Sequence, residues 1–87
     1  MRTTDLETTD IELASAIMTA AGRKPAAIRP GKELVEFLFP MNETTREVAI
    51  RYAAGTLFQD VRRLANNRRW LYQQVRAVAA SGKEVRP

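Results

Sequence analysis

The sequence contains neither cysteine nor histidine among its 87 residues. The lack of cysteine excludes a disulfide framework and suits a reducing compartment. The lack of both residues removes the usual ligands of zinc and other transition metals, since the remaining carboxylates suit hard cations. It also removes a cysteine nucleophile and a histidine base. We therefore predict a protein that is not an enzyme and that holds no metal or cofactor.

Long apolar runs are also missing. The longest run is far below the roughly 20 residues that cross a bilayer, and the N-terminal stretch lacks the apolar segment of a signal peptide. We expect a soluble, cytoplasmic protein without a membrane partner. A chain of this length has one modest core and little stability in reserve, so self-association would help it.

The net charge of +4 is concentrated in the second half of the chain. Residues 1–44 hold five Lys/Arg and seven Asp/Glu, whereas residues 45–87 hold nine and three. This asymmetry is typical of proteins that bind polyanions, although it also serves solubility.

A capping box at Thr9-Asp10-Ile11-Glu12 predicts the start of a first helix. In such a box the Thr9 hydroxyl and the Glu12 carboxylate each accept a hydrogen bond from a backbone N–H. Apolar residues then recur at helical spacing, and Gly22 is placed to end the helix in a left-handed conformation. We expect residues 1–8 to form a flexible tail.

The composition then shifts to prolines and to β-branched and aromatic residues, which predicts a β-hairpin. Its strands would cover about residues 26–29 and 33–39, and Pro30-Gly31 would form the turn.

Alternation along the second strand separates two faces. Val35, Phe37 and Phe39 share the face that should enter the core. Leu34 and Leu38 share the opposite face, where they are candidates for an interface with a partner.

Asn42 predicts the cap of a second helix over residues 43–54, which Gly55 would end. Residues 56–58 could form a short third strand that joins the hairpin, because two strands alone are marginally stable. A last helix would run over residues 60–80.

These elements predict the α+β class, with the order α-β-β-α-α. We expect one domain over residues 9–80, followed by a flexible C-terminal tail over residues 81–87.

The last helix carries an apolar stripe that should pack on the rest of the domain. At 100° per residue, the stripe consists of Val61, Leu64, Leu71, Val75 and Val78. Arg68 falls near its centre, where an unpaired guanidinium is costly to bury. We therefore expect Arg68 to pair with Glu36 or with an acidic residue near the N-terminus.

Arg62, Arg69 and Arg76 recur along another face of this helix, about 10 Å apart along its axis. No acidic residue lies three or four positions from any of them. One interpretation is a surface that follows the phosphates of a nucleic acid without reading its sequence. The alternative is a solvated face, or arginines that pair elsewhere in the fold.

Trp70 lies far from the middle of the apolar stripe, in line with Arg63 and beside several amide side chains. An aromatic residue in these surroundings could stack on a nucleobase or anchor a protein interface. It could also fold back over the hairpin or over its own arginines.

Several short motifs carry a family resemblance. They are Thr9-Asp10-Ile11-Glu12-Leu13-Ala14, Gly22, Phe37-Leu38-Phe39, Tyr52-Ala53-Ala54-Gly55 and the leucines of the last helix. Together they resemble a family of small domains of unknown function from bacteria and their phages, over about residues 8–78. The resemblance implies a helix, hairpin, helix, helix unit in a mobile-element or bacterial cytoplasmic setting, and it implies no activity.

The sequence thus predicts a small basic module that makes weak, sequence-independent contacts with nucleic acid. The contact residues would be Arg62, Arg69, Arg76, Arg63 and Trp70. The alternative is a protein-interaction or self-assembling domain, such as a homodimer, that uses Leu34, Leu38 and Trp70.

Overall fold

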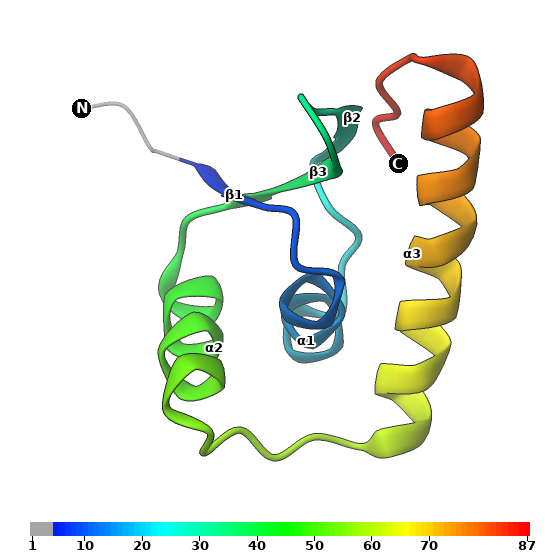
Figure 1. Cartoon of the computed structure of the whole chain (residues 1–87). Coiled ribbons are helices and arrows are strands. Elements are labelled where there is room, and N and C mark those ends of the chain that lie inside the picture. Colours follow the sequence, from blue (N-terminus) through cyan, green and yellow to red (C-terminus); the bar gives the residue numbers. More distant parts are fainter. Residues whose placement is uncertain (1–4) are drawn as a thin grey trace.

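The computed structural model describes residues 5–87, which form a three-stranded antiparallel sheet and three helices (Figure 1). In chain order the elements are β1 (Asp5–Thr8), α1 (Ile11–Ala21), β2 (Ala27–Pro30), β3 (Val35–Pro40), α2 (Glu43–Ala54) and α3 (Val61–Ser81). The predicted α+β class, the hairpin and the three helices are confirmed. The order is β-α-β-β-α-α, with one strand more at the N-terminal side than the sequence predicts.

The third strand of the sheet is β1, and the prediction of a strand at residues 56–58 is wrong. β3 lies between the other two strands, so that Leu6 faces Phe39 and Ile28 faces Phe37. The hairpin thus gains its third strand from the segment expected to be a flexible tail. Residues 1–4 of that predicted tail lie outside the described residues.

The chain also returns to the sheet after α3. Ile28 and Val85 form an antiparallel bridge through two backbone hydrogen bonds of 2.8 Å. Val85 is half-buried against the core. The segment expected to be a C-terminal tail therefore pairs with the edge of β2 that faces away from β3.

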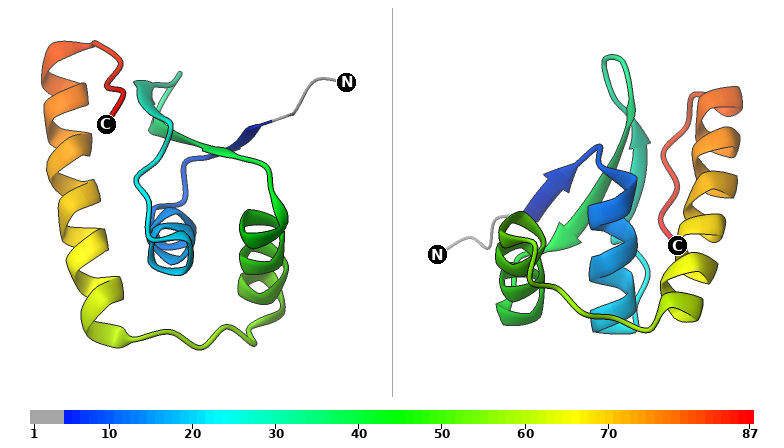
Figure 2. Two further views of the ribbon diagram at one scale, coloured as in Figure 1. Left: turned by 180° about the vertical axis from the view of Figure 1, so that it is seen from behind. Right: turned by 60° about the horizontal axis from the view of Figure 1, so that its bottom comes forward.

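The helices pack against one face of the sheet, with α1 between α2 and α3 (Figures 1 and 2). The core has its largest buried residues on α1, the hairpin and α3: Ile17, Met18, Ile28, Phe37, Phe39, Leu71 and Val78. The predicted core face of the second hairpin strand is therefore confirmed, with Val35 half-buried at its edge.

Local signals place the helix ends well, with one correction at α1. Its cap is Asp10, whose Oδ1 accepts from the backbone N–H groups of Glu12 at 2.9 Å and Leu13 at 3.3 Å. The predicted capping box is therefore wrong, because the neighbouring carboxylate takes the place of the Thr9 hydroxyl. The Glu12 carboxylate points elsewhere, to α3. Gly22 ends the helix with φ 65°, as predicted.

The bounds predicted for α2 are confirmed. Asn42 Oδ1 accepts from the Thr45 N–H at 2.9 Å, and Gly55 ends the helix with φ 72°. α2 nevertheless adds little to the core, since Val48 is its one core residue, whereas α3 adds Leu71 and Val78 together with half-buried side chains packed against them. α2 therefore contributes the least to the core of the three helices.

The outer face of the sheet carries a small ion-pair network. Arg29 lies 3.0 Å from Glu36 and 3.0 Å from Glu7, which joins all three strands. The hydrogen bond that Arg29 donates to Glu36 is the main cause that raises the pKa of the Arg29 guanidinium above its ordinary value. Leu38 lies half-buried on this face.

None of the helices over residues 5–87 is both long and apolar enough to cross a membrane.

Candidate nucleic-acid interface

α3 is the most basic element of the protein. Between Val61 and Ser81 it has five arginines and no acidic residue. The structure divides these arginines between two roles: Arg63 and Arg68 contact α1, and the others face solvent.

Arg68 is a structural residue, as predicted. Its Nη1 donates to both carboxylate oxygens of Glu12, at 3.0 and 3.1 Å. Of the two expected partners, the acidic residue near the N-terminus is the observed one, because Arg29 occupies Glu36. The pair joins α1 to α3 and removes one positive charge from the outer surface of α3.

Arg62, Arg69 and Arg76, here called the arginine ridge, are all exposed. None of them forms an ion pair with a residue of the described chain, whereas Arg29, Arg51, Arg68 and Arg86 each do. On an α-helix their spacing places them on the side opposite the buried Leu71 and Val78. The ridge is therefore an outward-facing row of unneutralised charge.

A shallow depression of about 490 Å³ lies beside the ridge. It is lined by Ala65, Arg68, Arg69, Tyr72, Gln73 and Arg76. The lining is basic and holds a half-exposed aromatic ring, since 46% of Tyr72 is accessible. Cations next to an aromatic ring and an amide suit contacts with phosphate and sugar.

Arg63 and Trp70 lie on a different side of α3, next to the C-terminal end of α1. Arg63 Nη2 donates to the Thr19 carbonyl at 3.2 Å, where a cation also suits the negative end of the helix dipole. Trp70 is half-buried and packs against the core. Trp70 thus folds back in part onto its own domain, where its ring meets Lys24 and not an arginine. Its role in contacts with nucleic acid or with a partner stays a prediction.

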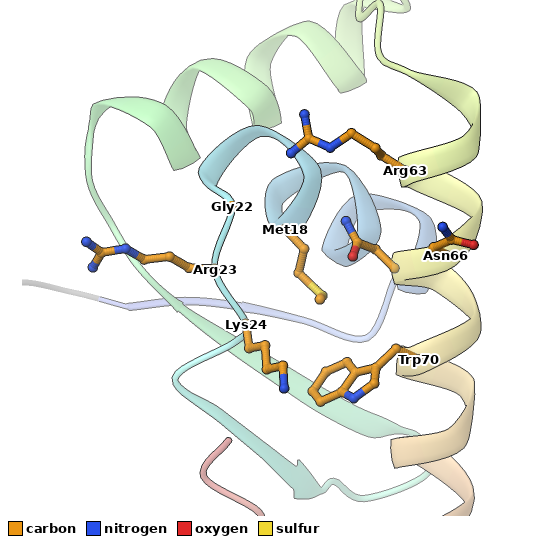
Figure 3. Close-up of a pocket in the computed structure, with 8 residues that line it drawn as sticks. Met18, Gly22, Arg23, Lys24, Arg63, Asn66 and Trp70 are labelled. Atoms are coloured by element: carbon orange, nitrogen blue, oxygen red, sulfur yellow. The ribbon is translucent and has the colours of Figure 1, made fainter.

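A second depression lies on this side of α3 and has a volume of about 430 Å³ (Figure 3). It is here called the Trp70 pocket. It is lined by Met18, Gly22, Arg23, Lys24, Arg63, Asn66, Asn67 and Trp70. The Lys24 ammonium lies 4.8 Å from the centre of the indole ring. The sequence identified Arg63 and Trp70 but missed Met18 and Lys24, because these come from α1 and the loop after it.

The predicted interface residues Leu34, Leu38 and Trp70 do not form one surface. Leu34 is 63% exposed in the connection between β2 and β3, and Leu38 is half-buried on the outer face of the sheet. Lys24, which covers Trp70, precedes the opposite end of β2. The structure therefore separates the three residues.

A different apolar surface surrounds the connection between α2 and α3. Phe58 is 94% exposed, Val61 78% and Ile50 61%. Val61 is thus not part of the packed stripe of α3, contrary to the sequence prediction. The depression lined by Ile50 and the one lined by Phe58 share Glu47 and Arg51, which form an ion pair between them.

Three of the carboxylates near the N-terminus have structural partners. Glu7 pairs with Arg29, Glu12 pairs with Arg68, and Asp10 caps α1. Asp10 Oδ2 also accepts a hydrogen bond from the Tyr52 hydroxyl at 2.8 Å, and this bond is the main cause that raises the pKa of Tyr52.

Comparison with known proteins adds no relative: no family model matches the chain, and neither a curated protein nor a solved structure matches it. The resemblance to small bacterial and phage domains therefore stays a prediction.

Proposed function

We propose that this protein is a non-enzymatic module that binds nucleic acid through the arginine ridge of α3, without sequence preference. The observation that supports the proposal most is that the arginines of this helix fall into two groups. Arg63 and Arg68 are used by the fold, while Arg62, Arg69 and Arg76 are exposed and lack an acidic partner among the described residues.

The dimensions of the ridge fit a nucleic-acid backbone. Fourteen residues separate its first and last arginines, which is about 21 Å along the helix axis. At roughly 3.4 Å of rise per nucleotide, this length spans about six steps of one strand. Contacts of this kind fix a protein on the backbone but carry no base information, which fits weak and general binding.

Fluorescence anisotropy with a labelled duplex measures this binding directly. If the ridge and one further cation neutralise about four phosphates, the log-log salt slope is about −3.6. The affinity should then fall about a hundredfold between roughly 50 and 200 mM salt. No binding at about 50 mM salt, either to the duplex or to a single strand of the same length, would refute the proposal.

The ridge itself is tested by reversing two of its charges, Arg62→Glu with Arg69→Glu. The matched control is Lys32→Glu with Arg46→Glu, since both pairs lower the net charge of +4 to zero. We expect the ridge variant alone to lose binding while its circular dichroism stays native. Equal losses in the two variants would show that the ridge is not the binding surface, and unfolding of the ridge variant would contradict the proposal by showing that these arginines pair within the fold.

The resemblance to bacterial and phage domains extends the proposal to the biological setting. In that setting the module would be an accessory protein of a phage or mobile element in the bacterial cytoplasm. Neighbouring genes for replication, packaging or defence would identify the nucleic acid that it meets.

Self-association is a second candidate function, supported by the exposed side chains of Ile50, Phe58 and Val61. Phe58 and Val61 lie three residues apart in the chain, and large apolar residues that are exposed close together are typical of contact surfaces. We expect sedimentation velocity to show a dimer at high protein concentration that Phe58→Ser abolishes. Leu34→Ser is the control, because Leu34 is similarly apolar and exposed but lies on another part of the molecule. A monomer at all concentrations would exclude this function.

A further inference from the structure

We propose that the nucleic acid is single-stranded and that one of its bases enters the Trp70 pocket and stacks on the indole ring. This inference rests on the proposed function, since the arginine ridge would hold the backbone beside the pocket. It adds the class of nucleic acid and a second contact site.

The pocket adjoins the ridge. At 100° per residue, Asn66 lies between Arg69 and Trp70 on the surface of α3, and it also lines the pocket. In Figure 3 its amide points away from the pocket, toward the outer side of the helix. A strand held on the ridge therefore reaches the pocket by passing one side chain, whose amide can bond to sugar or phosphate.

The charge of the pocket suits an anionic ligand. Three cations line it, Arg23, Lys24 and Arg63, and no carboxylate does. Two depressions next to α2 are different, because each has Glu47 and one further acidic residue in its lining. The Trp70 pocket and the depression along the ridge, by contrast, have cations and no acidic residue in their lining, and they flank the same helix.

Trp70 offers a face on which a base can stack. The Lys24 ammonium covers the ring at 4.8 Å and forms no ion pair with the described residues. A lysine on a flexible stem can leave the ring and contact the phosphate of the incoming nucleotide. The base then takes the place of the cation. Over residues 5–87 the indole N–H donates no hydrogen bond, so this exchange breaks none.

Arg63 and Met18 shape the rest of the pocket. In Figure 3 Met18 extends from α1 toward the indole, and Arg63 lies at the other end of the pocket from Lys24. One guanidinium nitrogen of Arg63 is held by the Thr19 carbonyl, which fixes its position and leaves further N–H groups for a ligand. The pocket volume of about 430 Å³ lies within the range of small-molecule sites, roughly 300–1,000 Å³.

The need for an unstacked base is what selects a single strand. In a duplex both faces of a base are covered by its neighbours, so the indole ring cannot reach them. Aromatic stacking tolerates any base, which agrees with binding that lacks sequence preference.

Tryptophan fluorescence tests the inference, because Trp70 is the single tryptophan of the chain. The full chain is titrated with an oligothymidylate of about 12 nucleotides and with a duplex of the same length, while anisotropy measures binding in parallel. We expect the single strand to quench the emission of Trp70 and the duplex to leave it unchanged. Binding of the single strand without any change in emission would overturn the inference but leave the ridge function standing.

Two variants separate stacking from charge. Lys24→Met should weaken single-strand binding and reduce the salt slope by about 0.7, the value for one phosphate contact. Lys32→Met removes the same charge outside the pocket and should change neither the single-strand affinity nor the salt slope. Equal effects of the two variants would contradict the site.

Trp70→Leu should weaken single-strand binding about tenfold and leave duplex binding unchanged. An equal loss for both ligands, in a variant with native circular dichroism, would also contradict the site. If this variant fails to fold, the Trp70 emission of the natural protein and the comparison of Lys24→Met with Lys32→Met still test whether a base stacks in the pocket. Absence of binding to either ligand would refute the proposed function itself.

Discussion

At the scale of single residues, Asp10 shows how one carboxylate connects two helices. Its Oδ1 caps α1, and its Oδ2 accepts from the Tyr52 hydroxyl of α2 at 2.8 Å. The bond favours the protonated hydroxyl, so the pKa of Tyr52 is raised above its ordinary value of 10.0, with smaller contributions from burial and from the charge of Asp10. Because α2 buries few side chains, this bond is an important part of its attachment.

Tyr52→Phe should lower the free energy of unfolding by about 0.5–1 kcal/mol at neutral pH, the usual net value of one hydrogen bond. Since the folded-state pKa is raised, this stabilisation is fully present below pH 10 and is lost as the pH rises through the folded-state value. Urea denaturation at neutral pH and at about pH 11 measures the difference. Tyr72→Phe is the control, because the hydrogen bonds of the described residues include none from its hydroxyl. Equal stability of the Tyr52 and Tyr72 variants would contradict this account.

At the scale of elements, the sequence predicts those features that depend on residues close together in the chain, such as helix ends. Gly22, Gly55 and Asn42 mark helix ends correctly because caps and left-handed turns are local features. The row of three arginines on α3 follows from helical spacing alone. β1 escapes detection because it has a single large apolar residue, Leu6, and its pairing partner Phe39 lies more than thirty positions away.

The same distinction explains what could be predicted of the candidate site. The ridge lies on one helix, so spacing is sufficient to find it. The Trp70 pocket joins α3 to Lys24 and Met18, which are separated from Trp70 by more than forty residues. Only the packing of α1 against α3 creates it. For the same reason the sequence left two possible partners for Arg68, and the structure shows that Glu12 is the one that pairs with it.

At the scale of the whole molecule, the segment after α3 closes the domain. It turns back to β2, where Val85 makes two backbone hydrogen bonds of 2.8 Å with Ile28 and covers part of the core. The bridge holds the C-terminal end of α3 against the sheet. It also covers an edge of β2 that would otherwise be open to pairing with another chain.

Deletion of residues 83–87 should therefore lower the free energy of unfolding by about 1–2 kcal/mol, from the lost hydrogen bonds and the lost burial of Val85. For a domain of this size the midpoint of thermal unfolding should fall by roughly 5–15 °C. Deletion of residues 86 and 87 alone is the control, since it leaves the bridge in place. Calorimetry of the three proteins measures the effect, and a long deletion that unfolds at the same temperature as the short one would show that the bridge does not hold α3. Because the deletion leaves Arg62, Arg69 and Arg76 in place, nucleic-acid binding below the unfolding temperature should remain close to that of the full chain.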